Sequence, residues 1–290
     1  MNKQDITTVG RRQFLSILTW AGAITAIPSL TLAAPARKGR LKQGVCRGVF
    51  KGIKLDLDGM CREAAKLGVV GIDLVGPDSF ATLKQHGLIP TMVNGASGIK
   101  KGINDKKNHA ETDLKMREAI KAAAQAGAPN VIVLAGDRAG ISDTEGADNT
   151  VAFLNGIKGL AEESKVTICM ELLNSKVNHP GYMADHTVWG VEVCKRVNSP
   201  RVKLLYDIYH MQIMEGDIIR TIRQNIQYIG HFHTAGNPGR NEFDDTQELN
   251  YRPICKAIAD LGYEGYISHE YTPTRDPLGT LEKMLAICEV

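Results

Sequence analysis

After residue 36, eight short apolar runs typical of β-strands alternate with amphipathic segments whose apolar residues recur every three to four positions. The strand-like runs are residues 43–49, 70–75, 88–93, 130–135, 166–172, 202–208, 228–233 and 265–271. The helical segments are residues 58–67, 113–126, 150–164, 187–197, 217–225 and 251–261. Strands that alternate with helices in this way indicate parallel β/α units.

Eight β/α units are enough to close into a barrel. Residues 37–290 amount to 254 residues, close to the roughly 250 that such a barrel needs. The competing fold is an open, doubly wound sheet, but its nucleotide-binding forms lose support because no G-x-G-x-x-G or G-x-x-x-x-G-K-[ST] motif follows the first strand-like run. No interior linker divides the chain. We therefore expect an α/β protein, a single (β/α)8 TIM barrel over residues 37–290.

Residues 1–36 are expected to lie outside this barrel. Arg11 and Arg12 precede a charge-free stretch, residues 13–36, which ends in an A-x-A pattern from Ala34 to Ala36. These features predict a cleavable twin-arginine export signal and a periplasmic protein. The alternative is an uncleaved membrane anchor, since 24 uncharged residues can span a bilayer. The stretch is only weakly apolar because it contains Thr19, Gly22, Thr25, Pro28, Ser29 and Thr31, so we expect cleavage and no stable membrane association afterwards.

The charge balance argues against nucleic acid as a partner. The whole chain has a net charge of +3, and removal of residues 1–36 leaves 32 basic and 31 acidic residues. No basic run is interleaved with aromatic residues, which a nucleic-acid footprint would need. We expect a small-molecule partner and no nucleic acid, and a homo-oligomer stays open.

Six cysteines are scattered along the chain without C-x-x-C spacing. An even number outside the cytoplasm invites a disulfide interpretation. However, all six lie in apolar helical or strand-like patterns, so we expect free, buried thiols that pack as small hydrophobic side chains. They do not resemble zinc ligands.

Four acidic or imidazole side chains stand at the ends of successive strand-like runs in the second half of the chain: Glu171, Asp207, His233 and Glu270. One such residue alone would more often be a helix cap or a surface charge. In a parallel barrel, however, the carboxyl ends of all strands meet at one mouth, so these four would converge there. Carboxylates with one imidazole suit a divalent cation such as Mn²⁺, Mg²⁺ or Co²⁺. The pattern predicts one divalent metal site.

Other polar residues are expected near the same mouth. His210 lies three residues beyond Asp207, and Arg240 lies in a glycine- and proline-containing loop. Arg240 could hold a substrate carboxylate or hydroxyl group through two hydrogen bonds, although pairing with the acidic residues that follow it is nearly as plausible. His179 and His109 lie in further loops that would overhang the mouth, although His109 could instead open the following helix.

Four segments of the same half are similar to a known family. They are LYDIYH at 205–210, HFHTAG at 231–236, PGRNE at 238–242 and ELNY at 248–251. Together they resemble the hydroxypyruvate isomerase family, within the xylose isomerase-like TIM barrel superfamily of sugar isomerases and epimerases. The resemblance runs from about residue 41 to the C-terminus and is densest between residues 171 and 273.

This resemblance implies that Glu171, Asp207, His233 and Glu270 bind one divalent metal ion, with Glu171 and Glu270 also acting as acid and base. It implies that His210 and Arg240 contact the substrate. Two features depart from the family. Some hydroxypyruvate isomerases carry glutamine where this chain has His233, which leans toward the epimerases, and cytoplasmic members have no export leader.

The expected activity is isomerisation through an enediolate, most simply hydroxypyruvate to tartronate semialdehyde. A ketose 3-epimerase or sugar isomerase would use the same chemistry, as would a lyase acting on oxidised sugars. An abasic-site endonuclease would need a histidine-rich trinuclear zinc cluster and a basic face, which the sequence does not supply. An exported sugar-binding protein without turnover has no need for two acid/base glutamates.

Overall fold

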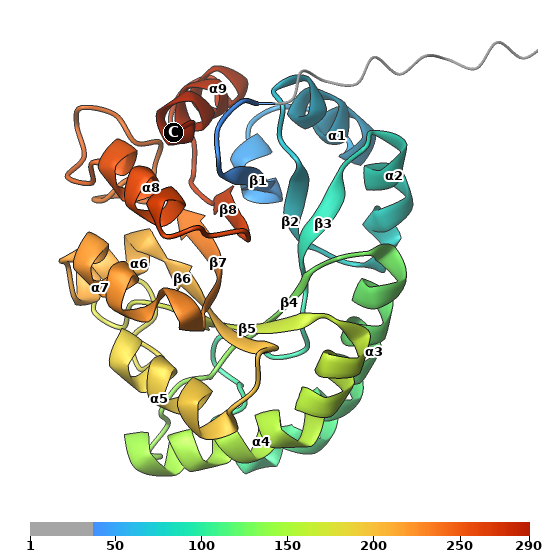
Figure 1. The fold of residues 1–290 in the computed structure, drawn as a ribbon, viewed down its shortest axis with the longest axis vertical. Coiled ribbons are helices and arrows are strands. Elements are labelled where there is room, and N and C mark those ends of the chain that lie inside the picture. The colour runs from blue at the N-terminus through green and yellow to red at the C-terminus, as the bar shows by residue number, and fades with distance from the viewer. Residues whose placement is uncertain (1–36) are drawn as a thin grey trace, which may run out of the picture. The chain divides into compact units, whose positions relative to one another are not determined.

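The computed structural model describes residues 37–290; the predicted export signal, residues 1–36, lies outside the described residues. Eight parallel strands form a closed barrel in chain order, with β8 pairing back onto β1 (Figure 1). The strands are β1 (Lys42–Cys46), β2 (Gly71–Val75), β3 (Ile89–Val93), β4 (Asn130–Val133), β5 (Thr167–Leu172), β6 (Val202–Asp207), β7 (Ile229–Thr234) and β8 (Tyr266–His269). The predicted TIM barrel is confirmed.

Helices surround the ring of strands (Figure 1). They are α1 (Leu57–Lys66), α2 (Phe80–Gln85), α3 (His109–Ala126), α4 (Asp143–Ser164), α5 (Thr187–Val197), α6 (Ile208–Met214), α7 (Ile218–Asn225), α8 (Tyr251–Asp260) and α9 (Pro277–Cys288). Four 3₁₀ turns add η1 (Arg47–Phe50), η2 (Pro77–Ser79), η3 (Lys106–Asn108) and η4 (Ile226–Tyr228). Among residues 37–290, no helix combines the length and the apolar character that a membrane span requires.

The structure corrects several predicted boundaries. The first strand ends at Cys46 rather than residue 49, because the chain turns into η1 and buries Val49 and Phe50. α4 begins at Asp143 rather than residue 150, because the Ser142 hydroxyl accepts the Glu145 N–H and caps the helix. α2, α6 and α9 were not predicted as helices.

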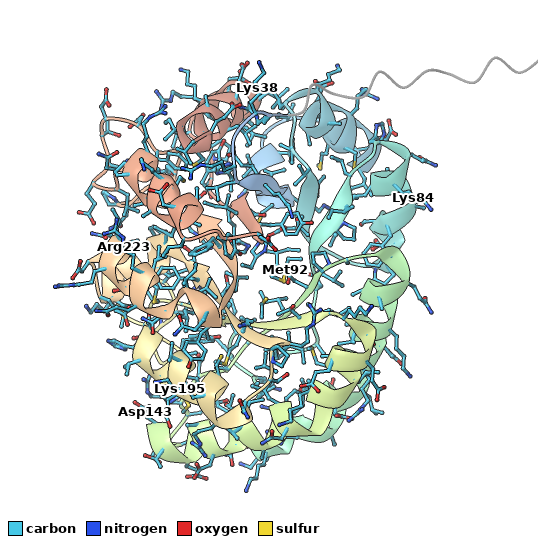
Figure 2. The ribbon with its side chains drawn as sticks, viewed as in Figure 1. Lys38, Lys84, Met92, Asp143, Lys195 and Arg223 are labelled. Carbon is cyan, nitrogen blue, oxygen red and sulfur yellow. The ribbon has the colours of Figure 1, made fainter. Side chains whose placement is uncertain are left out.

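Two apolar layers hold the barrel. The larger one fills the space between the strands and the surrounding helices, and a small cluster of Met92, Ile132, Cys169 and Leu205 lies inside the ring. Figure 2 shows Met92 within the ring, whereas labelled charged side chains lie at the periphery. All six cysteines are free and buried, as predicted.

β2 is irregular where it approaches the mouth. Leu74 has a φ of 58°, and the pairing of β2 with β3 shifts register on both sides of Asp73. In a regular strand successive side chains face opposite sides. Here Asp73 contacts His231 of β7 inside the barrel, and Leu74 packs against the interior cluster. The bulge therefore turns two consecutive side chains inward, a use of bulges that is common beside active sites.

Candidate active site

The four strand-end residues predicted as ligands come together at the mouth. Glu171 and His233 are the last residues but one of β5 and β7, Asp207 ends β6, and Glu270 follows β8. One ligand atom from each lies within 4.8 Å of those of the other three. His233 Nδ1 is 2.8 Å from Glu270 Oε2 and 3.4 Å from Glu171 Oε1. Residues separated by up to 99 positions therefore share one site.

Asp207 is both a helix cap and a residue of the site, two roles that the sequence presented as alternatives. Its Oδ1 accepts the His210 N–H at 3.2 Å and caps the first turn of α6. Its Oδ2 lies 3.1 Å from Arg240 Nη2, within the site. A carboxylate has two oxygens, so capping the helix leaves the second one available for the site.

The three carboxylates of the site are electrostatically unequal. Burial raises the pKa of Glu171, and the neighbouring charges of Glu270 and Asp207 add to this against the opposing effect of His233. Burial also acts to raise the pKa of Glu270, but His233 and Arg240 outweigh it and lower that pKa. Glu270 therefore keeps its charge to lower pH than an ordinary glutamate, whereas Glu171 keeps its proton to higher pH.

Arg240 belongs to the site rather than to the acidic residues that follow it. Its Nη2 lies 2.7 Å from Glu270 Oε2, while its backbone carbonyl accepts the Thr272 N–H at 2.8 Å and fixes the loop. The neighbouring Glu242 pairs instead with Arg275, at 2.9 Å. The arginine is thus placed to contact both the carboxylates and any molecule bound over them.

His210 and His179 lie beside Arg240, and both are neutral. Burial first and the charge of Arg240 second lower the pKa of each imidazole, that of His210 to well below its usual value. His210 Nδ1 accepts the Asn174 N–H at 3.1 Å, so its proton sits on Nε2. That Nε2 is buried and has no hydrogen-bond partner among the described residues, which leaves one donor for a bound molecule.

The structure does not bring His109 to this site. His109 is the first residue of α3, and its Nε2 lies 2.9 Å from the carbonyl oxygen of Ile103. Its ring packs edge-on against Phe153 with 5.1 Å between centroids. His109 therefore begins helix α3, the alternative to a position at the mouth that the sequence left open.

A cavity of about 450 Å³ opens beside Glu171 and Glu270. Its lining also includes His179 and Arg240 and the apolar residues Leu74, Ile99, Ile132, Leu134 and Leu173. A small molecule held here would meet both charged groups and hydrocarbon.

Sequence reasoning missed Asp73, which lies behind the site. Its Oδ2 is 3.0 Å from His233 Nε2 and 2.6 Å from His231 Nε2. All three side chains are fully buried. Asp73 sits within an apolar run, and only an inward-facing His231 on the same face as His233 hinted that such a partner was needed.

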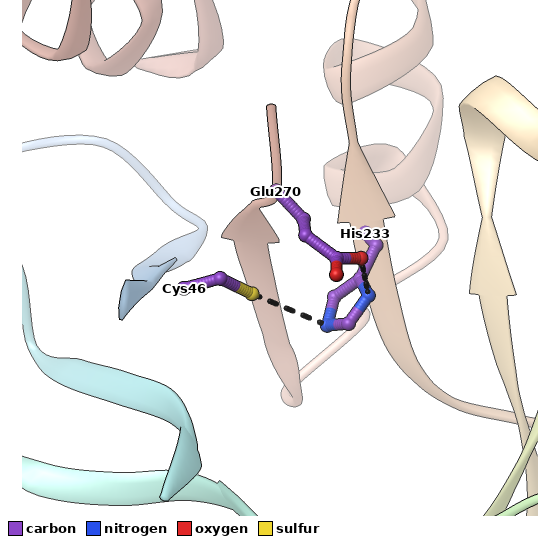
Figure 3. A group of neighbouring side chains, drawn as sticks. All are labelled: Cys46, His233 and Glu270. Carbon is purple, nitrogen blue, oxygen red and sulfur yellow. Dashed lines mark hydrogen bonds and ion pairs between the residues drawn. The ribbon is translucent and has the colours of Figure 1, made fainter. Parts of the chain in front are cut away.

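Cys46 also approaches His233, as Figure 3 shows, with its Sγ 3.9 Å from Nε2. Glu270 contacts the opposite ring nitrogen, Nδ1. Cys46 and Glu270 therefore contact different nitrogens of the same imidazole. Burial raises the pKa of the Cys46 thiol far above its usual value and keeps it protonated.

The residues present fit a divalent cation. Glu171, Asp207 and Glu270 bring three carboxyl groups together against the single guanidinium of Arg240, a negative excess that a divalent ion would balance. His233 Nδ1 is buried without a hydrogen-bond partner among residues 37–290 and faces the carboxylates. Oxygen donors with one imidazole match the preferences of Mn²⁺, Mg²⁺ or Co²⁺.

The fold and the site together define a (β/α)8 barrel with a carboxylate and imidazole centre at the mouth, where catalytic groups of such barrels lie. The sequence matches the family described as "Xylose isomerase-like TIM barrel" over residues 62–288, and the chain belongs to this family.

Comparisons with individual proteins agree with this assignment. A putative hydroxypyruvate isomerase from Xenopus laevis is 27% identical over 256 residues, covering 81% of this chain and 92% of that protein. The crystal structure of D-psicose 3-epimerase from Clostridium cellulolyticum H10 with D-tagatose superposes with a TM-score of 0.72 at 20% identity, covering 86% of this chain and 100% of the other. The named relatives are isomerases, structural neighbours include epimerases, and this chain is an enzyme of that group.

A barrel named AP endonuclease, family 2, from Brucella melitensis superposes with a TM-score of 0.77 at 24% identity, covering 85% of this chain and 99% of the other. At that identity the similarity shows the fold. In the described part of this chain, every cluster able to hold a metal includes His233, so a separate three-metal, histidine-rich centre is not present there.

Proposed function

We propose that this chain is a divalent-metal-dependent isomerase that moves a proton between neighbouring carbons of a small hydroxy-carbonyl substrate through an enediolate. The observation that carries the proposal is the convergence of Glu171, Asp207, His233 and Glu270 beside Arg240. A divalent cation held by these four side chains would polarise the substrate carbonyl and stabilise the negative charge of the enediolate.

The two glutamates are suited to opposite roles. His233 and Arg240 keep Glu270 ionised, so its carboxylate can remove the proton from carbon. Burial and neighbouring negative charge raise the pKa of Glu171, which suits it to deliver a proton to the adjacent carbon or the opposite face. Isomerisation and epimerisation differ only in where that proton returns.

Two further residues would orient the substrate. The Nε2–H of His210 is a buried donor without a partner in the described chain, and it can bind a substrate hydroxyl or carbonyl oxygen. Arg240 covers the same carboxylates and can contact a second oxygen. His179 also lines the cavity.

Hydroxypyruvate, converted to tartronate semialdehyde, is the first substrate we propose. It is supported by similarity to a putative hydroxypyruvate isomerase that extends over 92% of that protein. A ketose 3-epimerase is the second candidate. This candidate is favoured by His233. Some hydroxypyruvate isomerases have glutamine at this position, and histidine here is closer to the ligand pattern of the epimerases.

Proton–deuterium exchange in D₂O tests the proposal. Protein loaded with Mn²⁺ or Co²⁺ is incubated with hydroxypyruvate and with a panel of ketoses, and deuterium at carbon is followed by NMR. Exchange on one substrate, lost in the Glu270→Gln variant, identifies the carbon acid and the base. Metal-loaded protein that binds a sugar but exchanges no proton would favour a binding protein instead.

We also propose that residues 1–36 direct export by the twin-arginine route, with cleavage after Ala36 or close to it, and that the metal is loaded in the cytoplasm before export. N-terminal sequencing of periplasmic protein and metal analysis of both compartments test this. An intact Met1 in the membrane fraction, or apoprotein in the cytoplasm, would contradict it.

A further inference from the structure

A buried polar cluster lies behind His233, on the side away from Glu171 and Glu270. Asp73 of β2 faces His231 and His233 of β7, with its Oδ2 2.6 Å and 3.0 Å from their Nε2 atoms. Its Oδ1 accepts a hydrogen bond from the Thr91 hydroxyl of β3. None of these four side chains is exposed to solvent.

The hydrogen bonds of this cluster determine which ring nitrogens of His231 and His233 carry a proton. Both oxygens of Asp73 face hydrogen-bond donors, Oδ1 the Thr91 hydroxyl and Oδ2 the two imidazole nitrogens, as the oxygens of a carboxylate do. A carboxylate only accepts hydrogen bonds. Both imidazoles must therefore carry a proton on Nε2. For His233 this leaves Nδ1 as the nitrogen that faces Glu270 and Glu171.

We propose that Asp73 is a positioning residue for the metal centre. By accepting the Nε2–H of His233 it holds the ring in one orientation and one tautomer, with the Nδ1 lone pair directed at the cation. A ligating histidine is commonly fixed by a partner on its other nitrogen. This inference rests on the proposed metal site, and it assigns to Asp73 an effect that acts through His233 rather than on the substrate.

The bulge in β2 is part of this arrangement. Asp73 lies between the two register shifts against β3, directly before Leu74 with its φ of 58°. Its carboxylate is engaged on both oxygens, by Thr91 on one and by the two imidazoles on the other. A strand without the irregularity would not place Asp73 and Leu74 on the same side. The bulge therefore contributes to the inward orientation that lets Asp73 reach His233.

The Asp73→Asn variant tests the proposal, because an amide has nearly the same shape but carries no charge. Its carbonyl oxygen can still face both imidazoles and its NH2 can face the Thr91 hydroxyl, so the substitution removes the charged acceptor that orients the His233 ring. Binding of Co²⁺ to apoprotein is measured by calorimetric titration, and the visible spectrum of the Co²⁺ complex reports ligand geometry. We expect affinity to fall by about 10–100-fold, with an altered spectrum.

The His231→Asn variant is the matched control, since it removes the other imidazole and leaves the Asp73–His233 contact. We expect its Co²⁺ affinity to stay within about threefold of wild type, because His233 keeps its partner. Folded Asp73→Asn protein with wild-type affinity and spectrum would overturn the inference, and so would equal losses in both variants, which would indicate a general packing role.

If Asp73→Asn does not fold, Thr91→Val decides, because it removes one hydrogen bond to Oδ1 while conserving volume. We expect affinity to fall about fivefold, the effect of one typical hydrogen bond, and unchanged affinity would overturn the inference. Wild-type protein that binds no Co²⁺ would instead contradict the proposed metal site itself.

Discussion

Glu171 and Glu270 are the same residue type within one site, yet their surroundings separate them. Glu270 contacts both His233 and Arg240, whereas Glu171 is buried with negative neighbours. Environments that move two carboxyl pKa values in opposite directions are a common basis for assigning acid and base. The roles therefore depend on neighbours rather than on sequence position.

Replacing Glu270 with Gln removes the proposed base but keeps the volume of the side chain. We expect proton exchange at carbon to fall by about 10²–10⁴-fold or more, with thermal unfolding close to that of wild type. Glu264→Gln, at an exposed position, is the control and should keep full activity. Near-normal exchange in Glu270→Gln would refute the assignment.

Arg240 is expected to set the acid limb of the pH profile. Its charge lowers the pKa of Glu270, so in Arg240→Met that pKa rises. The base must be ionised to act, and the acid limb of kcat/KM should therefore move to higher pH in the variant. Arg223→Met, on the exposed side of α7, should leave the profile unchanged. A shift to lower pH would contradict the electrostatic role.

At the scale of elements, long periodic segments were predictable and short or strained ones were not. All eight strands and six helices appear where the pattern placed them, within a few residues at most boundaries, apart from the early start of α4. α2 and α6 contain six and seven residues, fewer than two turns each, and so give almost no periodic signal. The β2 bulge has no sequence signal at all, because leucine seldom adopts a positive φ.

The same distinction explains what the sequence revealed of the site. Glu171, Asp207, His233 and Glu270 interrupt apolar runs at strand ends, where the barrel geometry brings them together. Asp73 could not be recognised in this way, since its inward orientation depends on tertiary contacts with β3 and β7.

The bulge leads to a stability prediction at Leu74. Alanine there would lose the apolar contacts and keep the unfavourable φ, whereas glycine would lose the same contacts and relieve the backbone. Relief of about 1–2 kcal/mol exceeds the entropic cost of glycine, about 0.5–1 kcal/mol. In urea denaturation we expect Leu74→Gly to be more stable than Leu74→Ala. The reverse order would show that the φ of 58° carries little strain.

At the scale of the molecule, the site draws one residue from the end of each of four consecutive strands or directly after it, so a bound cation would link these strands. Metal at about 100 times its Kd adds about 2.7 kcal/mol to the free energy of unfolding. A domain of this size gains about 2–4 °C per kcal/mol.

We therefore expect Mn²⁺ to raise the Tm of chelator-treated protein by about 5–10 °C in a calorimetric scan. The Asp207→Asn variant, which lacks one ligand, should show a smaller shift. An equal shift in that variant would mean that the ion binds elsewhere.

Pairing of β8 with β1 also sets the order in which the protein can be completed during synthesis. The strand that closes the ring, Tyr266–His269, and the glutamate that follows it leave the ribosome after the other seven strands. Until they emerge, β1 and β7 each keep one unpaired backbone edge, and the third carboxylate of the site is missing. A nascent chain interrupted before Tyr266 would therefore display two exposed edges, open to misassembly, and no complete catalytic centre.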